Sequence, residues 1–201
     1  MPQLSVIRMP GDVSRYDLVM AFFKLRKAIF IDKMDWPLYA YETIEFEQYD
    51  TFQAVYIIAH EGDRVLGGAR LIRTDHRIGN GSIRYSYMIR DAYEGVLPGM
   101  PQKLCYDEPP SAPNVWELTR LATLPGTDVA GDILNGANDF LLTEKAKTCL
   151  FLGPPGFLRM ARSMGYQPVR IGPTVRNDDG AFLAFSCDVV VREARTPELV
   201  G

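Results

Sequence analysis

The sequence predicts an α/β or α+β sandwich, in which a mixed sheet has helices on its faces. Strand-like apolar segments and helix-like periodic segments alternate along the chain, which favours this class over an all-helical or all-strand fold. The hydrophobic fraction of 47% and the charged fraction of 23% are typical of a globular protein. We expect residues 1–201 to form a single domain, because this length can bury one sizeable core.

The first part of the chain predicts a strand and a helix. Residues 4–8 alternate and indicate a short strand. Asp12 or Ser14 could cap a helix that runs to about Phe30. Four apolar residues at helical spacing support this helix, namely Leu18, Phe22, Leu25 and Ile29.

A hairpin follows. Its strands are the apolar residues 53–60 and residues 64–73, and the turn between them is Glu61-Gly62-Asp63. Gly67-Gly68 within its second strand indicates a bulge or a close approach of backbones. Residues 85–89 could form a further short strand.

The second half contains a Pro- and Gly-rich loop followed by alternating strands and helices. The loop covers residues 96–114. The predicted strands are residues 115–123, 150–152, 169–171 and 181–191, and the predicted helices are residues 128–148 and 157–164.

Composition argues against several classes of function. The net charge of -3 leaves no strongly basic surface for nucleic acid. No apolar run reaches the roughly 20 residues that span a membrane, and the N-terminus does not resemble a secretion signal. Three scattered cysteines indicate a reducing compartment, so we expect a cytoplasmic protein. His60 and His76 are not spaced as metal ligands, and we expect no bound metal.

Charged residues interrupt two strands that should be buried. Arg70 lies in the second hairpin strand, and Glu117 and Arg120 lie in strand 115–123. Such charges are costly in a core unless they are paired or face a cleft. Glu117 and Arg120 are three residues apart and would point to opposite faces of a regular strand, so a bulge or a partner on each side is required. Arg70 or Arg26 could pair with Glu117, and Asp50 or Glu47 could pair with Arg120.

Two interpretations of these charges remain open. They could form an ion-pair network that only fixes strand register, or they could surround a cleft in which a carboxylate accepts a proton. Residues 32–51, a long segment rich in aromatic and acidic side chains, favour the functional interpretation, because long loops in compact domains are usually functional.

Four blocks of sequence resemble the LuxI-type acyl-homoserine-lactone synthases, or autoinducer synthases, whose fold is related to the GNAT N-acyltransferases. They occur in the family's order: Leu25-Arg26-Lys27-Ala28-Ile29-Phe30 followed by Trp36, Glu45-Phe46-Glu47-Gln48-Tyr49-Asp50, Gly67-Gly68-Ala69-Arg70-Leu71, and Trp116-Glu117-Leu118-Thr119-Arg120-Leu121-Ala122. Any single block is a weak signal, whereas four in order are a strong one.

The resemblance implies a GNAT-like three-layer sandwich with a twisted, mostly antiparallel sheet and helices on both faces. It also implies an enzyme that transfers an acyl group from acyl-carrier protein or CoA to the amine of S-adenosylmethionine. Lactone closure then releases methylthioadenosine and a quorum-sensing signal. No permanently bound cofactor is expected, since S-adenosylmethionine and the acyl thioester are both substrates.

The family's functional residues carry over onto matching positions of this sequence. The implied catalytic residues are Glu117, Asp50, Arg70, Arg120 and Glu45, with Glu117 the first choice for the base and Asp50 the second. The implied binding residues for S-adenosylmethionine are Arg26, Phe30, Trp36 and Glu47. Glu47 stands where the family usually has Asp, so the side chain there is one methylene longer and its hydrogen-bond geometry is expected to differ from the family's.

The acyl chain is expected between the sheet and the two C-terminal helices. Candidate lining residues are Phe140, Leu141, Phe151, Leu152 and Phe157, each of which could equally be ordinary core.

Two other functions compete with this one. The first is a GNAT acyltransferase that uses acetyl-CoA and a different amine. Against it, residues 123–128 lack the spacing of the GNAT pyrophosphate loop. The second is a non-catalytic domain that senses adenosyl or acyl ligands and would not need Glu117.

Overall fold

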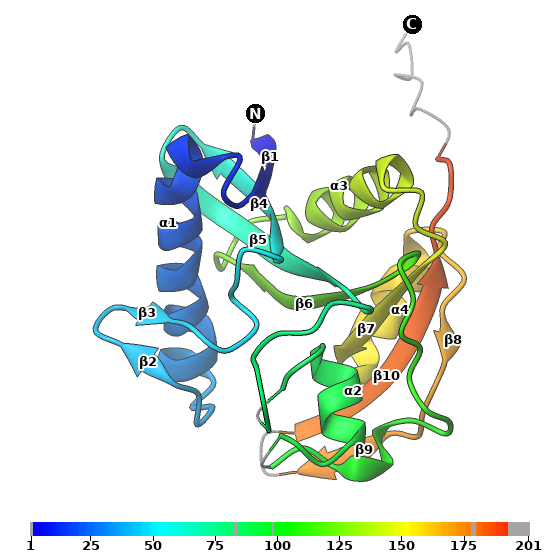
Figure 1. The fold of residues 1–201 in the computed structure, drawn as a ribbon. Coiled ribbons are helices and arrows are strands. Elements are labelled where there is room, and N and C mark those ends of the chain that lie inside the picture. Colours follow the sequence, from blue (N-terminus) through cyan, green and yellow to red (C-terminus); the bar gives the residue numbers. More distant parts are fainter. Residues whose placement is uncertain (1, 83, 98, 178–179, 193–201) are drawn as a thin grey trace, which may run out of the picture.

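The computed structural model describes residues 2–82, 84–97, 99–177 and 180–192 (Figure 1). Within these residues eight strands form one sheet, in the order β1-β4-β5-β6-β7-β10-β8 with β9 paired to β10. Only the β6–β7 pair is parallel among the described pairs. The strands are β1 (Gln3–Arg8), β4 (Val55–Glu61), β5 (Arg64–Arg73), β6 (Val115–Thr123), β7 (Thr148–Gly153), β8 (Val169–Arg170), β9 (Val175–Asn177) and β10 (Gly180–Asp188).

Helices cover both faces of this sheet (Figure 1). Helices α1 (Tyr16–Arg26) and α2 (Met88–Tyr93) contribute side chains to the core on one face. Helices α3 (Ala130–Thr143) and α4 (Pro155–Ser163) contribute to the core on the other face. The predicted mixed, mostly antiparallel sandwich is confirmed.

Strand periodicity explains why there are two cores. In β4, Ile57 belongs to the core beneath α3 and α4, whereas its neighbours Tyr56 and Ile58 belong to the core beneath α1. Every residue of β4 from Val55 to His60 is buried. A strand that is covered on both faces has no need of polar residues at alternate positions.

The two glycines of β5 allow the helices to approach closely. A Cβ atom on Gly68 would lie 2.9 Å from the Phe22 ring of α1, and one on Gly67 would lie 3.0 Å from Ile133 of α3. The pairing of β5 with β6 also shifts between Gly68 and Arg70. Such Cβ atoms on Gly67 and Gly68 would also lie 2.9 Å from the backbone oxygen of Ala122 and 3.0 Å from that of Ile57, respectively, so the close approach of backbones, one of the two predicted alternatives, is present.

The bulge on β6 resolves the conflict between Glu117 and Arg120. Thr119 pairs with Arg70 and Ala122 pairs with Gly68, so Arg120 and Leu121 together oppose one residue of β5. Arg120 has a φ of +56°, a left-handed conformation that is uncommon outside glycine. This extra residue lets Glu117 and Arg120 reach the same face, which is the α1 face.

Strands β6 and β7 separate beyond the middle of the sheet. Their described pairing runs from Val115 with Thr148 to Leu118 with Phe151. Residues 119–123 of β6 continue along β5 without a β7 partner in this pairing. The β7-side edge of residues 119–123 is therefore unpaired within the described part of the sheet, next to the charged residues on the face covered by α1.

Several local predictions were wrong. Residues 85–89 are not a strand: Tyr85 forms one isolated bridge with Ile78, and α2 begins at Met88. The first helix follows a 3₁₀ turn, Val13–Arg15, and continues as a π-helical turn, Lys27–Lys33. Asp12 does not cap it and instead accepts a bond from the Arg8 amide. The segment after the π-helical turn contains a small hairpin, β2 (Ala40–Tyr41) and β3 (Ile44–Glu45), and a further 3₁₀ turn spans Gln102–Leu104.

Of the helices described, none is both long enough and apolar enough to cross a membrane.

Candidate active site

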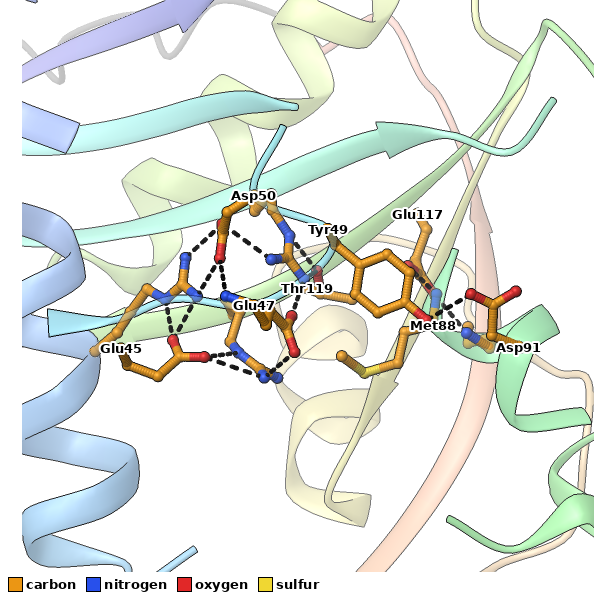
Figure 2. A network of polar contacts seen from close by, with 12 residues as sticks. Glu45, Glu47, Tyr49, Asp50, Met88, Asp91, Glu117 and Thr119 are labelled. Carbon is orange, nitrogen blue, oxygen red and sulfur yellow. Dashed lines mark hydrogen bonds and ion pairs between the residues drawn. The ribbon is translucent and has the colours of Figure 1, made fainter. Parts of the chain in front are cut away.

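Charged side chains from four parts of the chain meet on the α1 face of the sheet (Figure 2). They come from the end of α1, from β3 and the loop after it, from β5 and from β6. The structure brings together all seven charged residues that the sequence singled out, which are Arg26, Glu45, Glu47, Asp50, Arg70, Glu117 and Arg120. Most of them are fully buried, so each charge requires a partner.

Asp50 is the centre of the ion-pair network. Its two carboxylate oxygens accept bonds from Nη1 and Nη2 of Arg26, both at 2.8 Å, in a bidentate pair. Arg70 donates from Nη1 at 3.0 Å, and the Tyr56 hydroxyl donates at 2.9 Å. Burial alone would raise the pKa of Asp50, but the guanidinium groups of Arg70 and Arg26 lower it well below its usual range. Asp50 is therefore a fixed anion, which makes it a poor proton acceptor.

Glu47 and Glu45 connect Arg120 to this network. Glu47 bridges two arginines, accepting from Arg70 Nη2 at 2.5 Å and from Arg120 Nη2 at 2.6 Å. Glu45 accepts from Arg26 and from Arg120 Nε, the latter at 3.3 Å. Burial would raise the pKa of Glu47, yet Arg120 and Arg70 together lower it. The longer side chain at position 47 thus reaches both guanidinium groups.

Glu117 has a different environment from the other three carboxylates. Its oxygens accept bonds from the backbone amides of Met88, at 3.0 Å, and Ile89, at 2.8 Å. These are the first two residues of α2. The predicted pairing of Glu117 with Arg70 or Arg26 is replaced by these neutral donors. Burial raises the pKa of Glu117 to about 7, although the two amide bonds and the Arg70 charge act in the opposite direction.

This difference separates the carboxylates chemically. A carboxyl group that titrates near neutral pH is suited to proton transfer, whereas carboxylates bound by arginine are suited to holding structure or charge. Of the two candidate bases suggested by the sequence, the geometry favours Glu117 over Asp50.

Phe30 and Trp36 form an aromatic wall beside the charged group. Their rings stack at 5.2 Å with an angle of 7° between planes. The Arg120 guanidinium lies 5.7 Å from the centre of the Phe30 ring, and Phe182 contacts Trp36 edge-on at 6.0 Å. Phe30 is buried in the α1-face core, whereas Trp36 is only partly buried. Trp36 therefore keeps surface that a ligand can contact.

A small apolar cavity lies on the opposite face, between the sheet and helices α3 and α4. Three of the predicted acyl-pocket residues line it, Leu141, Phe151 and Phe157. The other two do not. Leu152 follows Phe151 on β7 and therefore packs into the α1-face core, and Phe140 contacts the Trp116 ring edge-on at 5.6 Å.

Several buried residues complete the site without having been predicted. Thr119 accepts from Nε and Nη2 of Arg70 at 3.2 and 3.0 Å. It lies two residues after Glu117 on the same strand, so strand periodicity would have placed it on the site face. Tyr56 and Tyr49 gave no comparable signal, because tyrosines in an apolar strand or loop are ordinary core residues. Asp91 gave none because it lies between the predicted strand 85–89 and the predicted loop 96–114, outside any predicted element.

Known structures place this fold among the N-acetyltransferase-like sandwiches. The structure aligns with that of a putative N-acetyltransferase from Lactobacillus plantarum with a TM-score of 0.58 and 14% identity, covering 94% of this chain and 99% of the other. It aligns better, with a TM-score of 0.77 and 20% identity, with BjaI, a CoA-dependent acyl-homoserine lactone synthase solved with SAM and isopentyl-CoA. That alignment covers 94% of this chain and 84% of BjaI.

Sequence comparison gives the family. The autoinducer synthase model matches residues 12–121, which is more than half of the chain and includes every charged residue of the site. An acyl-homoserine-lactone synthase of Acinetobacter nosocomialis is 25% identical over 185 residues, 86% of this chain and 92% of that protein. The chain belongs to the autoinducer synthase family.

The raised pKa of Glu117 predicts a specific dependence of stability on pH. The carboxyl binds its proton more tightly in the folded protein, at about 7, than at its ordinary value of 4.5, so stability is lost as pH rises between these values. Glu117→Gln has no titrating group there. The free energy of unfolding of the variant minus that of wild type should therefore be larger at pH 8 than at pH 5, by roughly 2–3 kcal/mol. Urea denaturation at both pH values measures this, and a constant difference would contradict the raised pKa.

Proposed function

We propose that this protein is an acyl-homoserine-lactone synthase that makes a quorum-sensing signal from S-adenosylmethionine and an acyl thioester. The observation that supports this most strongly is Glu117, an amide-held carboxylate with a pKa near neutrality beside a network of buried arginines. The site falls within the residues that match the autoinducer synthase family. The whole chain, residues 1–201, would act as one synthase domain in the cytoplasm, where both substrates are made.

The first chemical step is acyl transfer to nitrogen. Glu117, directly or through a water molecule, takes a proton from the ammonium group of S-adenosylmethionine, and the freed amine attacks the thioester carbonyl carbon. A carbon–nitrogen bond forms, the carbon–sulfur bond breaks, and a second proton from the nitrogen passes to the departing thiolate, which leaves as a thiol. Backbone amides of β6 after Leu118, where β7 no longer pairs, would stabilise the negative charge on the carbonyl oxygen.

The second step closes the lactone. An oxygen of the methionine carboxylate attacks the γ-carbon of the same molecule, and the carbon–sulfonium bond breaks to release neutral methylthioadenosine. Trp36, stacked on Phe30, offers a π face to the sulfonium or the adenine. Arg26 and Arg70 hold the loop carboxylates in place, and these carboxylates would form the side of the site that contacts the methionine group.

The acyl chain would occupy the cavity lined by Leu141, Phe151 and Phe157, on the side of β6 and β7 away from the charged network. The donor would be a thioester of acyl-carrier protein or of CoA, both of which present the same reacting carbonyl. An N-acetyltransferase acting on another amine would share the fold but would not need S-adenosylmethionine.

Release of methylthioadenosine tests the function directly. Purified protein supplied with S-adenosylmethionine and a panel of acyl-CoA and acyl-carrier-protein thioesters should release methylthioadenosine and the matching lactone. Release should require the thioester, because lactone closure follows acylation. Chromatography with mass spectrometry detects both products. Acylation of other amines without methylthioadenosine would instead support the N-acetyltransferase function.

Removal of the Glu117 carboxylate should abolish most of the rate. Glu117→Ala is expected to fold and to lose at least about a hundredfold in kcat, the lower end of a general-base contribution. The matched control is Glu61→Ala, the same change at the exposed last residue of β4, which should stay near the wild-type rate. A Glu117→Ala variant with a rate close to that of the control would remove Glu117 from proton transfer.

Trp36 should act on one substrate only. Trp36→Ala is expected to raise the KM for S-adenosylmethionine roughly tenfold, the equivalent of one cation–π contact, and to leave the KM for the thioester within about twofold. Steady-state kinetics with each substrate varied in turn measures both values. Equal increases for the two substrates would show that Trp36 only supports the fold.

A further inference from the structure

Tyr49 connects the two chemically different halves of the site. Its ring faces the guanidinium of Arg70 at 5.4 Å, and its backbone directly precedes Asp50. Its hydroxyl donates to Oδ2 of Asp91, in α2, at 2.6 Å. Tyr49 is fully buried, and Figure 2 shows its ring spanning the space between the arginine network and α2.

Asp91 in turn fixes the chain just before α2. Its carboxylate accepts from the Ser86 amide, 3.0 Å from each oxygen, and from the Ser86 hydroxyl at 3.0 Å. Asp91 is 1% exposed, so its buried carboxylate needs the hydrogen bonds from Ser86 and Tyr49 in place of water. The path of the chain into α2 is therefore set by a side chain that is itself bonded to the site loop.

The start of α2 is the part of the chain that holds Glu117. The amides of Met88 and Ile89 follow Ser86 by two and three residues, so their direction depends on how Ser86 is held. Helix α2 has only six residues, and a helix this short has little stability of its own. External anchors must keep these amides pointed at the carboxylate.

We propose that Tyr49 and Asp91 are positioning residues, whose hydrogen bond couples the site loop to α2 and so aims the Met88 and Ile89 amides at Glu117. The benefit to catalysis rests on the proposed function, in which Glu117 accepts the proton. Neither Tyr49 nor Asp91 needs to touch substrate for this role. A base held by two aligned amides has a fixed position, which proton transfer requires.

Amide hydrogen exchange in the free protein tests the coupling without any substrate. Tyr49→Phe keeps the ring against Arg70 and removes only the hydroxyl. Exchange at Met88 and Ile89, measured by NMR, should accelerate about tenfold, in line with the loss of one hydrogen bond to a charged group. The matched control is Tyr56→Phe, which removes a buried hydroxyl that donates to Asp50 instead, and it should leave these two amides unchanged.

A second variant addresses the other end of the bond. Asp91→Asn can still accept from Ser86 through its amide oxygen, but it loses the charge-assisted bond from Tyr49, and it should accelerate the same two amides. Unchanged exchange in both Tyr49→Phe and Asp91→Asn, or equal acceleration in Tyr56→Phe, would overturn the proposal.

Kinetics then show whether the coupling serves catalysis. Tyr49→Phe should lower kcat about tenfold and leave the KM for S-adenosylmethionine within about twofold, because the substrate contacts remain. A rise in KM at constant kcat would overturn the positioning role. Wild-type protein that releases no methylthioadenosine with any thioester would instead overturn the proposed function, while the exchange result stands by itself.

Discussion

The buried carboxylate of Asp50, held by Arg26 and Arg70, is the interaction on which the rest of the site depends. It joins the end of α1, the loop after β3 and the central strand β5. An unpaired charge at this depth would cost several kcal/mol, so loop and helix must keep their relative positions. The fixed path of the loop also places Glu47 between Arg70 and Arg120, and it places Tyr49 against α2.

The site uses neutral and charged donors for different purposes. Glu45, Glu47 and Asp50 are bound by arginines and hold the architecture, and the arginines lower the pKa of Glu47 and of Asp50. Glu117 is fully buried, and this burial raises its pKa to about 7 even though the two backbone amides that bind it act in the opposite direction. Environments that push the pKa values of neighbouring carboxyl groups apart are a recurrent way to assign one as a base and the others as fixed anions.

The sequence predicted the sheet, its flanking helices and the charged group, since strand and helix periods and the cost of buried charge are local properties. The conflict between Glu117 and Arg120 predicted either a bulge or a partner on each side of the strand, and the structure has the bulge. Leu152 was misplaced although strand alternation separates it from Phe151. Helix α2 was missed for a different reason: its six residues are stabilised by side chains distant in sequence, above all Glu117 and Tyr49. The partners of such a short helix become visible only in three dimensions.

The separation of the carboxylates can be measured residue by residue. Carboxyl groups labelled with ¹³C report their own titration in NMR spectra of the wild-type protein. Glu117 should titrate with a midpoint near the value of about 7 set by its burial, while Asp50 should stay ionised well below its ordinary value of 3.8. A midpoint for Glu117 near its ordinary value of 4.5, or an Asp50 that titrates alongside it, would contradict the separation of the two carboxylates.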